Sequence, residues 1–439
     1  MKFYDRIHEI SLIRDIRKDA RRNARLTVVT GRRRIGKTQL IRNALNDKPY
    51  LYFYVARKSE KDLCSGFQAE IQRVLNIPVI GEAHRFETLF AVLMEQAKRE
   101  TFTLVIDEFQ EFFNVNPSIF SVMANIWDNA QKESRMNLIV CGSVNRLMTR
   151  IFKDAAEPLY GRNTGKLHVE PFRVSVLKTI LADHKPDYSN DDLLALWTMT
   201  GGVARYVEQL MDARACDRTS MIETIFRSDS SFLDEGLSVL IQEFGKEYGT
   251  YFSILSAIAS GHTDYAQIKN DVGTEVGSFL SKLEHDYELI KRKLPIFTPP
   301  RAKCANYVID DCFFRFWFRF VWKYQYLREL GRFDVLRDRV ERDFNTFSGY
   351  ALERYFYWKF LEERKYTRMD AWWDRKGENE IDLVCEDEVS NRIDFYEIKR
   401  DRDRIDLNQL KIKSAAFLEK NPGLRNRAQR HLALSLSDM

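Results

Sequence analysis

Turn-forming and cross-linking residues are scarce in this chain. Glycine and proline account for only 19 and 10 of its 439 residues, and there are six cysteines. A composition this poor in glycine and proline excludes a collagen-like chain and is not that of a disordered one. The cysteines form no CxxC pair and have no histidine cluster nearby, so neither a zinc site nor a disulfide framework is predicted. We expect a reducing, cytoplasmic location.

Long apolar runs are also absent. The N-terminal segment 1–25 is charged throughout, and no window of about 18 apolar residues occurs, whereas a membrane-spanning helix requires such a run. We therefore expect neither secretion nor a membrane partner. Lysine and arginine exceed aspartate and glutamate only by 69 to 64, which is too small an excess to indicate a polyanionic partner by itself. Any basic surface must be local.

The chain does have length and apolar surface in quantity. Hydrophobic residues make up 44% of its 439 positions, and a single core stops growing at roughly 250–300 residues. Several globular domains are therefore expected.

The first 170 residues alternate short apolar runs with amphipathic stretches. The runs LTVVTG, YLYFYVA, TLVID, NLIVCG and KLHVEPF lie at 26–31, 50–56, 103–107, 137–142 and 166–172. Such alternation predicts an α/β fold in which helices flank a parallel sheet.

Helical patterns dominate the next segment, 174–245, where two helices are broken at Gly201 and Gly202. We interpret this segment as a lid. Three short helical patterns and a basic hairpin-like stretch, KRKLPIFTPPRAKCANYVID, then fill 248–310. This order predicts a winged helix-turn-helix.

An aromatic segment, CFFRFWFRFVWKYQYL at 312–327, follows the hairpin. It is apolar on every face of a helix, which favours a buried helix over a base-stacking stripe. A last α/β unit begins at about 346, with strands expected near 381–385, 393–398 and 431–436.

A phosphate-binding motif comes directly after the first apolar run. GRRRIGKT at 31–38 fits GxxxxGK[ST] between a strand and a helix, the context that the motif requires. Lys37 is expected to reach the β and γ phosphates of ATP and Thr38 to offer its hydroxyl to Mg²⁺, while main-chain N–H groups surround the phosphates. The predicted nucleotide-binding residues are Gly31, Arg32, Arg33, Arg34, Ile35, Gly36, Lys37, Thr38 and Gln39.

Two carboxylates end the strand at 103–107, as in a Walker B motif. Asp107 is expected to hold the Mg²⁺ shell, and Glu108 to act as general base toward an attacking water. After the strand at 137–142, Ser143 or Asn145 either senses the γ-phosphate or caps the next helix, and we favour Ser143 as the sensor. Arg162 is a candidate arginine finger for a neighbouring subunit, which would require a homo-oligomer.

Several segments together resemble one known family, the archaeal-type AAA-related ATPases. They are FYDRIHEI (3–10), GRRRIGKT (31–38), VIDEFQ (105–110), CGSV (141–144), PLYGR (158–162) and GGVARYV (201–207). The resemblance covers essentially the whole chain and implies a P-loop core with the strand order of an AAA-type sheet. It also implies a winged helix, a C-terminal domain similar to PD-(D/E)xK nucleases, and Arg6 beside the adenine. Ala204 departs from the family, which usually has proline there.

The C-terminal unit holds a separate group of chemically useful side chains. Asp382 and Glu397 lie on two expected neighbouring strands, and Lys399 follows two residues after Glu397 on the same strand face. Asp382 and Glu397 could bind Mg²⁺ or Mn²⁺ while Lys399 positions the attacking water, and Glu353 could complete the metal shell. This is what the PD-(D/E)xK resemblance implies, with Ile381 at the nominal proline position. Charged edge strands remain the alternative.

The basic hairpin offers a possible contact with DNA. Its cations are Lys291, Arg292, Lys293, Arg301 and Lys303. A wing of this kind contacts phosphates in DNA-binding proteins, but winged helices also recruit proteins, so both partners remain open.

These observations predict an ATP-binding, Mg²⁺-dependent ATPase that couples its nucleotide state to DNA binding or to metal-dependent cleavage by the C-terminal domain. The alternative is a nucleotide-dependent switch that recruits proteins and keeps an inactive nuclease-like domain as a scaffold. The predicted domains are an ATPase core (1–173), a lid (174–245), a winged helix (246–310), an aromatic helical connector (311–345) and a nuclease-like domain (346–439).

Overall fold

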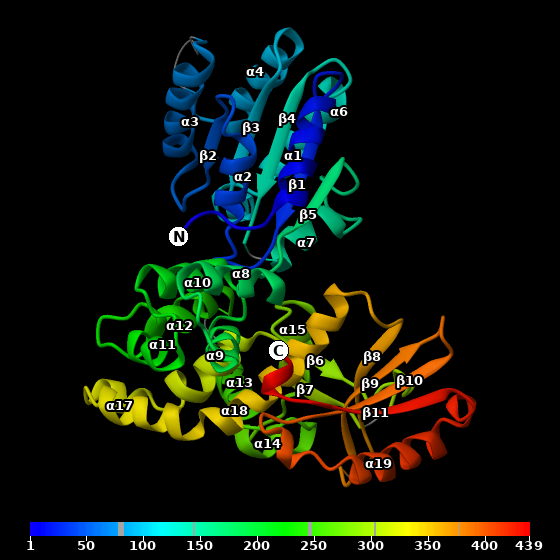
Figure 1. Cartoon of the computed structure of the whole chain (residues 1–439). Helices are drawn as coiled ribbons and strands as arrows, with labels where there is room; N and C mark the ends of the chain where they lie inside the picture. Colours follow the sequence, from blue (N-terminus) through cyan, green and yellow to red (C-terminus); the bar gives the residue numbers. More distant parts are fainter. Residues whose placement is uncertain (78–82, 144, 245–247, 303, 376) are drawn as a thin grey trace. The chain divides into compact units, whose positions relative to one another are not determined.

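The computed structural model describes residues 1–439 apart from 78–82, 144, 245–247, 303 and 376 (Figure 1). The chain forms two compact units, one of residues 5–170 and one of residues 1–4 and 171–439.

The 5–170 unit is built on a parallel sheet with the strand order β2-β3-β4-β1-β5. Its strands are β1 (Arg25–Thr30), β2 (Leu51–Tyr54), β3 (Phe102–Asp107), β4 (Met136–Cys141) and β5 (Gly165–His168). All five coincide with the predicted apolar runs, so the predicted parallel sheet is confirmed.

Helices cover both faces of this sheet. They are α1 (Ile7–Asp19), α2 (Lys37–Leu45), α3 (Glu60–Leu75), α4 (Phe86–Arg99), η1 (Phe109–Glu111), α5 (Phe112–Val115), α6 (Ser118–Ala130) and α7 (Asn145–Lys153). Alternate residues of β1 to β4 pack against α3, α4 and α6 in one continuous apolar core that includes Phe53, Phe90 and Leu138. β3 and β4 are buried along their whole length, which explains their unbroken apolar sequences.

The second unit begins with helices. They are α8 (Val174–His184), α9 (Asn190–Thr200), α10 (Ala204–Asp212), α11 (Arg218–Ile225) and α12 (Phe232–Phe244). α9 and α10 are separated at Gly201 and Gly202, as predicted, and both glycines have positive φ angles, 57° and 75°. Three helices and an antiparallel hairpin follow, in the predicted order: α13 (Tyr248–Ala259), α14 (Tyr265–Val272), α15 (Gly277–His285), β6 (Ile290–Lys293) and β7 (Asn306–Ile309).

The aromatic segment forms α16 (Cys312–Phe316) and a π-helical stretch, η3 (Trp317–Trp322). Its side chains from Phe313 to Val321, apart from the two arginines, are buried, whereas Tyr326 near the end of the segment is 48% exposed. The indole Nε1 of Trp317 donates to the carbonyl of Phe232 over 3.1 Å. The prediction of a buried helix is confirmed. The sequence pattern did not indicate the π-helical turn, which is rare and occurs mostly as a single turn within a helix.

α17 (Gln325–Glu329) leads into α18 (Phe333–Glu362), a single helix of 30 residues. The predicted domain boundary between 345 and 346 therefore falls inside a continuous helix. No glycine-proline break or cap interrupts the sequence there, so the helix continues from the predicted connector into the last unit.

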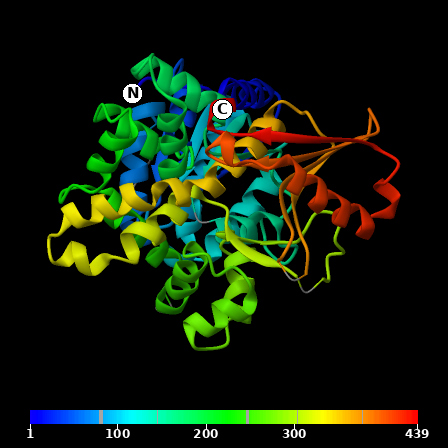
Figure 2. The same cartoon turned by 60° about the horizontal axis from the view of Figure 1, so that its bottom comes forward.

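The last part is a mixed four-stranded sheet with the order β11-β10-β9-β8. Its elements are β8 (Arg368–Trp373), β9 (Glu380–Asp387), β10 (Arg392–Ile398), η4 (Arg402–Arg404), α19 (Leu407–Lys420), η5 (Pro422–Leu424), β11 (Ala428–Leu434) and η6 (Leu436–Asp438). Its C-terminal strand, β11, is drawn in red in Figure 2. β8, β9 and β10 are antiparallel, whereas β11 runs parallel to β10. Three strands match the prediction; β8 was not predicted.

Two helices sandwich this sheet. Phe417 of α19 makes edge contacts with Trp372 and Phe395, and Phe360 of α18 contacts Tyr396 on the other side. Trp373 donates from Nε1 to the carbonyl of Cys304. Both tryptophans therefore have structural contacts.

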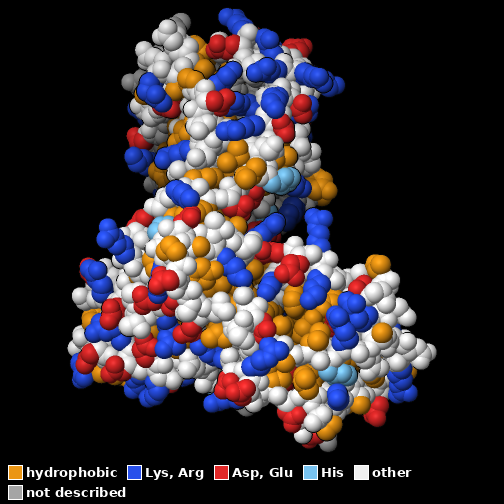
Figure 3. All heavy atoms as spheres, in the orientation of Figure 1, with side chains coloured by type: hydrophobic (Ala, Val, Ile, Leu, Met, Phe, Trp, Pro, Cys, Tyr) orange, Lys and Arg blue, Asp and Glu red, His pale blue; other side chains and the backbone are white. Residues whose placement is uncertain are grey.

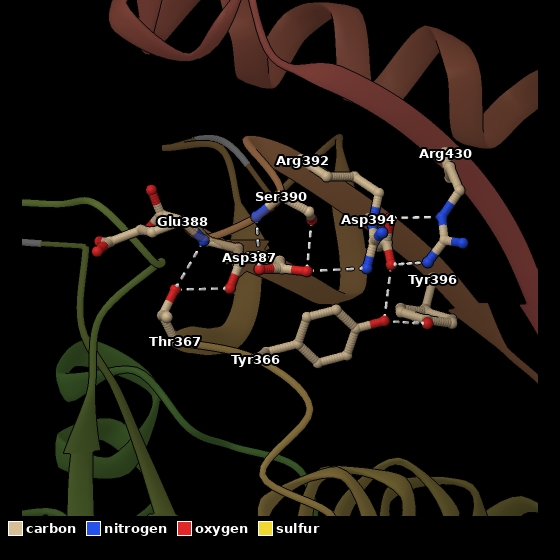
Figure 4. A network of polar contacts seen from close by, with 10 residues as sticks. Tyr366, Thr367, Asp387, Glu388, Ser390, Arg392, Asp394, Tyr396 and Arg430 are labelled. Carbon is tan, nitrogen blue, oxygen red and sulfur yellow. Dashed lines mark hydrogen bonds and ion pairs between the residues drawn. The ribbon is translucent and has the colours of Figure 1, made fainter.

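A buried carboxylate network ties β10 to β11 and to the segment before β8 (Figure 4). Asp394 is fully buried, and it accepts hydrogen bonds from Arg430 over 2.8 Å and from Tyr366 over 2.7 Å. Burial alone raises the pKa of Asp394, but the bonds from Arg430 and Tyr366 outweigh it and hold the pKa below its usual value. The charge of Asp394 therefore has a structural role, because its partners hold β10, β11 and the segment before β8 together.

None of the described helices combines the length and the apolar character that a transmembrane span requires. All six cysteines are free thiols, and no disulfide joins them.

The Gly202 turn yields a stability prediction. A Cβ at Gly202 would collide with the carbonyl oxygen of Phe172, and the φ of 75° is unfavourable for alanine. We expect Gly202→Ala to lower the free energy of unfolding by about 2 kcal/mol or more, measured by chemical denaturation. Gly349, inside α18, has no atom within 4 Å of such a Cβ, so Gly349→Ala should stabilise by about 0.5–1 kcal/mol. Equal effects of both substitutions would contradict this account.

Candidate functional sites

The carboxyl ends of β1, β3 and β4 bring the predicted nucleotide-binding side chains to one edge of the sheet. Lys37 opens α2 and is buried, and its ammonium donates to the carbonyls of Gly31, over 2.8 Å, and Arg32, over 3.0 Å. Burial lowers the pKa of Lys37, while the nearby charges of Glu108 and Asp107 oppose that shift. A phosphate anion would favour the charged ammonium in the same way.

The loop between β1 and α2 is tightly folded against the sheet. Gly31 has a φ of 144°, and a Cβ there would lie 2.5 Å from the carbonyl oxygen of Val169. Only glycine fits this approach. Ile35 is buried and anchors the loop, whereas Arg34 and Gln39 are exposed to solvent.

Thr38 and Asp107 form the pair that a divalent cation requires. The Thr38 hydroxyl donates to Oδ2 of Asp107 over 2.9 Å, and the Tyr52 hydroxyl donates to the same oxygen over 2.5 Å. Hard oxygen ligands beside a buried lysine match the chemistry of Mg²⁺ bound with phosphates, so these residues fit Mg-ATP. Tyr52 was not predicted, because it lies within an apolar strand that gives no functional signal.

Glu108 is held in place by two neighbours. Its carboxylate accepts hydrogen bonds from the Ser143 hydroxyl, over 2.9 and 3.0 Å, and from the side-chain amide of Gln110, which is fully buried. Its own φ is 53°, an uncommon value for a non-glycine residue. The structure thus brings Ser143 to Glu108, and its role as a γ-phosphate sensor stays a prediction. The side chain of Asn145 lies outside the described residues.

Arg6 and Arg162 are engaged within the 5–170 unit. Arg6 is buried and donates to Glu9 over 3.0 Å and to the carbonyl of Glu170. Arg162 makes a two-pronged ion pair with Asp128, over 2.9 and 2.6 Å. An adenine contact of Arg6 and a finger role of Arg162 in a second subunit stay predictions, and the latter requires the Asp128 pair to open.

The C-terminal candidates also meet at one end of a sheet. β9 and β10 are antiparallel, so Asp382 near the start of β9 lies beside the end of β10. Asp382 accepts a hydrogen bond from the backbone N–H of Ile398 over 2.6 Å. The ammonium of Lys399 lies 3.1 Å from Oε1 of Glu397 and 3.4 Å from Oδ2 of Asp382. The predicted trio is therefore one cluster.

A second lysine, Lys413 of α19, completes this cluster. Its ammonium lies 3.1 Å from Oε2 of Glu397, so Lys399 and Lys413 share the carboxylate of Glu397. The described residues contain no group of three acidic, histidine or cysteine side chains arranged to hold a metal ion. The sequence did not point to Lys413, because an isolated lysine on an amphipathic helix carries no motif.

Glu353 of α18 joins the same cluster electrostatically. Burial and the negative charges of Asp382 and Glu380 together raise its pKa to about 8, against the opposing charges of Lys399 and Arg315. Burial likewise raises the pKa of Asp382. Perturbed carboxylates that share an environment are typical of functional sites.

The cations of the basic hairpin are less available for a contact with DNA than the sequence suggests. Lys291 pairs with Asp310 over 2.5 Å, and Arg292 donates to the carbonyls of Pro300 and Ala302. Lys293 is largely buried, with 15% of its side chain exposed. Arg301 is exposed, and Lys303 lies outside the described residues. Most of the described cations of the hairpin therefore make contacts within the protein.

Charged side chains of both signs are mixed over the face shown in Figure 3. That face has no broad area of a single sign, in keeping with the small net charge of +5.

Comparisons with known proteins agree with this geometry. Residues 3–210 match an ATPase domain family found predominantly in Archaea, and residues 317–412 match a family of archaeal and bacterial proteins of unknown function. An uncharacterized protein of Methanocaldococcus jannaschii is 28% identical over 91% of this chain and 89% of its own length. The structure of a Walker-type ATPase of Pyrococcus abyssi covers 72% of this chain and 96% of its own, with 19% identity and a TM-score of 0.55. That likeness is one of fold.

The raised pKa of Glu353 predicts how stability depends on pH. Between the ordinary value of 4.5 and about 8, the folded protein keeps a proton that the unfolded chain has released. Raising the pH through this window therefore favours unfolding, by up to about 1.4 kcal/mol per pH unit. In EDTA, Glu353→Gln should remove this pH-dependent loss of stability. The free energy of unfolding of the variant should therefore rise relative to that of the wild type as the pH rises. Denaturation of both across this range tests it.

A matched control lies at the C-cap of the same helix. Glu363 is exposed, and Glu363→Gln should leave the pH profile unchanged. Parallel profiles for the wild type and Glu353→Gln would show that Glu353 titrates normally.

Proposed function

We propose that this chain hydrolyses ATP with Mg²⁺ and that its nucleotide state controls a C-terminal domain acting on DNA. The match of residues 3–210 to an ATPase domain family found predominantly in Archaea supports the first part. The observation that carries the hydrolytic part is the set of contacts around Asp107 and Glu108.

The proposed roles follow from these contacts. Lys37 and the main-chain N–H groups of its loop bind the β and γ phosphates, and Thr38 and Asp107 hold the cation. When bound, Mg²⁺ supplies charge neutralisation at the phosphates. Glu108 accepts a proton from the attacking water, and Ser143 orients the carboxylate of Glu108, with which it shares a hydrogen bond.

Substitutions of Lys37 and Glu108 separate binding from chemistry. We expect Lys37→Ala to weaken ATP binding by about tenfold or more, because it removes the ammonium from the phosphates. Glu108→Gln should bind ATP and lose at least about a hundredfold in turnover, because an amide cannot accept the proton. Calorimetry and phosphate release measure the two effects. Lys48 is exposed after α2, so Lys48→Ala serves as the control and should bind and hydrolyse ATP as the wild type does. Wild-type turnover in Glu108→Gln would refute the role of Glu108 as general base.

For the C-terminal domain, we propose metal-dependent cleavage of DNA. What supports it is the convergence of Asp382, Glu397 and Lys399 at one end of the mixed sheet, with Glu353 nearby. Carboxylates can bind a divalent cation, and a lysine beside them can orient and polarise a water for attack on a phosphodiester. Binding of a cation there requires Lys399 and Lys413 to yield part of their hold on Glu397.

Cleavage is tested with DNA and Mn²⁺. We expect Asp382→Asn and Lys399→Met to lose cleavage of linear, nicked, branched or single-stranded DNA by at least about a hundredfold, because they remove a metal ligand and the water-orienting group. Asp387→Asn, at the far end of β9, is the matched control. Cleavage that survives in both site variants would belong to a contaminating enzyme.

One observation favours a second candidate function. The carboxylate of Glu397 is already paired with the ammonium groups of Lys399 and Lys413, which is the arrangement of a stable ion-pair cluster. A domain of this kind could act as a scaffold whose recruitment of partners follows the nucleotide state of the ATPase. Absence of cleavage for every DNA form, with intact ATP hydrolysis, would select this function.

A further inference from the structure

Arg315 of α16 has an unusual environment for an arginine. Its guanidinium lies over the rings of Tyr350, at 4.1 Å, and Phe347, at 4.9 Å, both on α18. Within the described part of the chain it makes no hydrogen bond and no ion pair. Burial lowers the pKa of Arg315. A half-buried guanidinium that lacks a bonded anion is costly, since its hydration is lost without a replacement.

Lys293 of β6 approaches the same ring. Its ammonium lies 6.0 Å from the centre of the Tyr350 ring, and its ion pair with Asp370 is long, at 3.7 Å. Burial lowers the pKa of Lys293 as well. Two cations from segments far apart in the sequence thus flank one tyrosine, whose own hydroxyl is buried without a hydrogen-bond partner among the described atoms.

These two cations border the carboxylate cluster. Tyr350 and Glu353 are one turn apart on α18, so the ring under Arg315 and Lys293 is adjacent to Glu353. The charge of Arg315 acts on Glu353, which in turn feels the charges of Asp382 and Lys399. The cations and the proposed cleavage site are therefore parts of one continuous region.

We infer that Arg315 and Lys293 bind the phosphodiester backbone of DNA beside this cluster, an inference that rests on the proposed action of the domain on DNA. An arginine stacked on an aromatic ring keeps its in-plane N–H donors available, and their fork matches two oxygens of a phosphate. Lys293 adds a point charge on the other side of the ring. A phosphate placed there supplies the anion that Arg315 lacks and lies next to Glu353, Asp382 and Lys399.

The alternative of a purely structural pair is distinguishable. A structural Arg315 would change the stability of the protein when replaced, with no effect on the salt dependence of DNA binding. A phosphate contact releases counterions, so its loss reduces the slope of log affinity against log salt.

The test is a salt titration of DNA binding by the full chain. Anisotropy of a fluorescein-labelled duplex, with Ca²⁺ in place of Mg²⁺ or Mn²⁺ to limit cleavage, gives the dissociation constant. We expect Arg315→Gln and Lys293→Gln each to weaken binding about tenfold and to lower the slope by about one. Arg315→Lys keeps the charge and loses the fork, so it should retain the slope and lose affinity.

Arg319→Gln is the matched control. Arg319 lies one turn further along the same aromatic segment, contacts Phe320 and pairs with Asp343 over 3.6 Å, so its replacement should leave DNA affinity unchanged. Thermal denaturation of each variant checks folding. A folded Arg315→Gln that keeps wild-type affinity and slope overturns the inference, as does a wild type that binds no DNA.

The outcome is separable from that of the cleavage proposal. If no DNA is cleaved but binding depends on Arg315, the phosphate contact stands and the catalytic role of Asp382 falls. If Asp382→Asn abolishes cleavage while Arg315→Gln binds DNA as the wild type does, the catalytic role stands and the phosphate contact falls.

Discussion

Parallel pairing of β1, β3 and β4 is the constraint on which the ATPase site depends. Because these strands run in the same direction, their carboxyl ends meet at one edge of the sheet. Residues that are 69 positions apart, Thr38 and Asp107, come within 2.9 Å there. Ser143 reaches Glu108 for the same reason. The apolar strands therefore serve the chemistry by fixing where their polar ends lie.

Most of this arrangement could be predicted from the sequence, because its signals are local. An apolar run followed by a glycine-rich loop and a helix is contiguous, and so is a buried strand that ends in two carboxylates. The side chains that contact these motif residues could not be predicted in this way. Tyr52, for example, bonds to Asp107 from the neighbouring strand β2. Such contacts depend on which strands become neighbours, which no local pattern specifies.

The C-terminal unit was harder to predict for the same physical reason. Asp382, Glu397 and Lys399 were found from their spacing, but β8 was missed because its sequence, RMDAWW, lacks the alternation of a half-buried strand. Lys413, Arg315 and Lys293 acquire their surroundings only through packing between α19, α16, β6 and the sheet. The basic hairpin shows the converse, since cations that suggest an open surface are ion-paired with Asp310 or hydrogen-bonded to backbone carbonyls.

The length of α18 has a consequence for how this architecture can be rearranged. Its 30 residues span about 45 Å at 1.5 Å per residue. Trp197 of α9 donates to the carbonyl of Ala351 near its middle, while Phe360 near its end lies against the sheet. A chimera joined between 345 and 346 would splice two foreign sequences within one cooperative helix. Recombination among such proteins is better tolerated in the loops on either side of α18, where a junction leaves its hydrogen bonds intact.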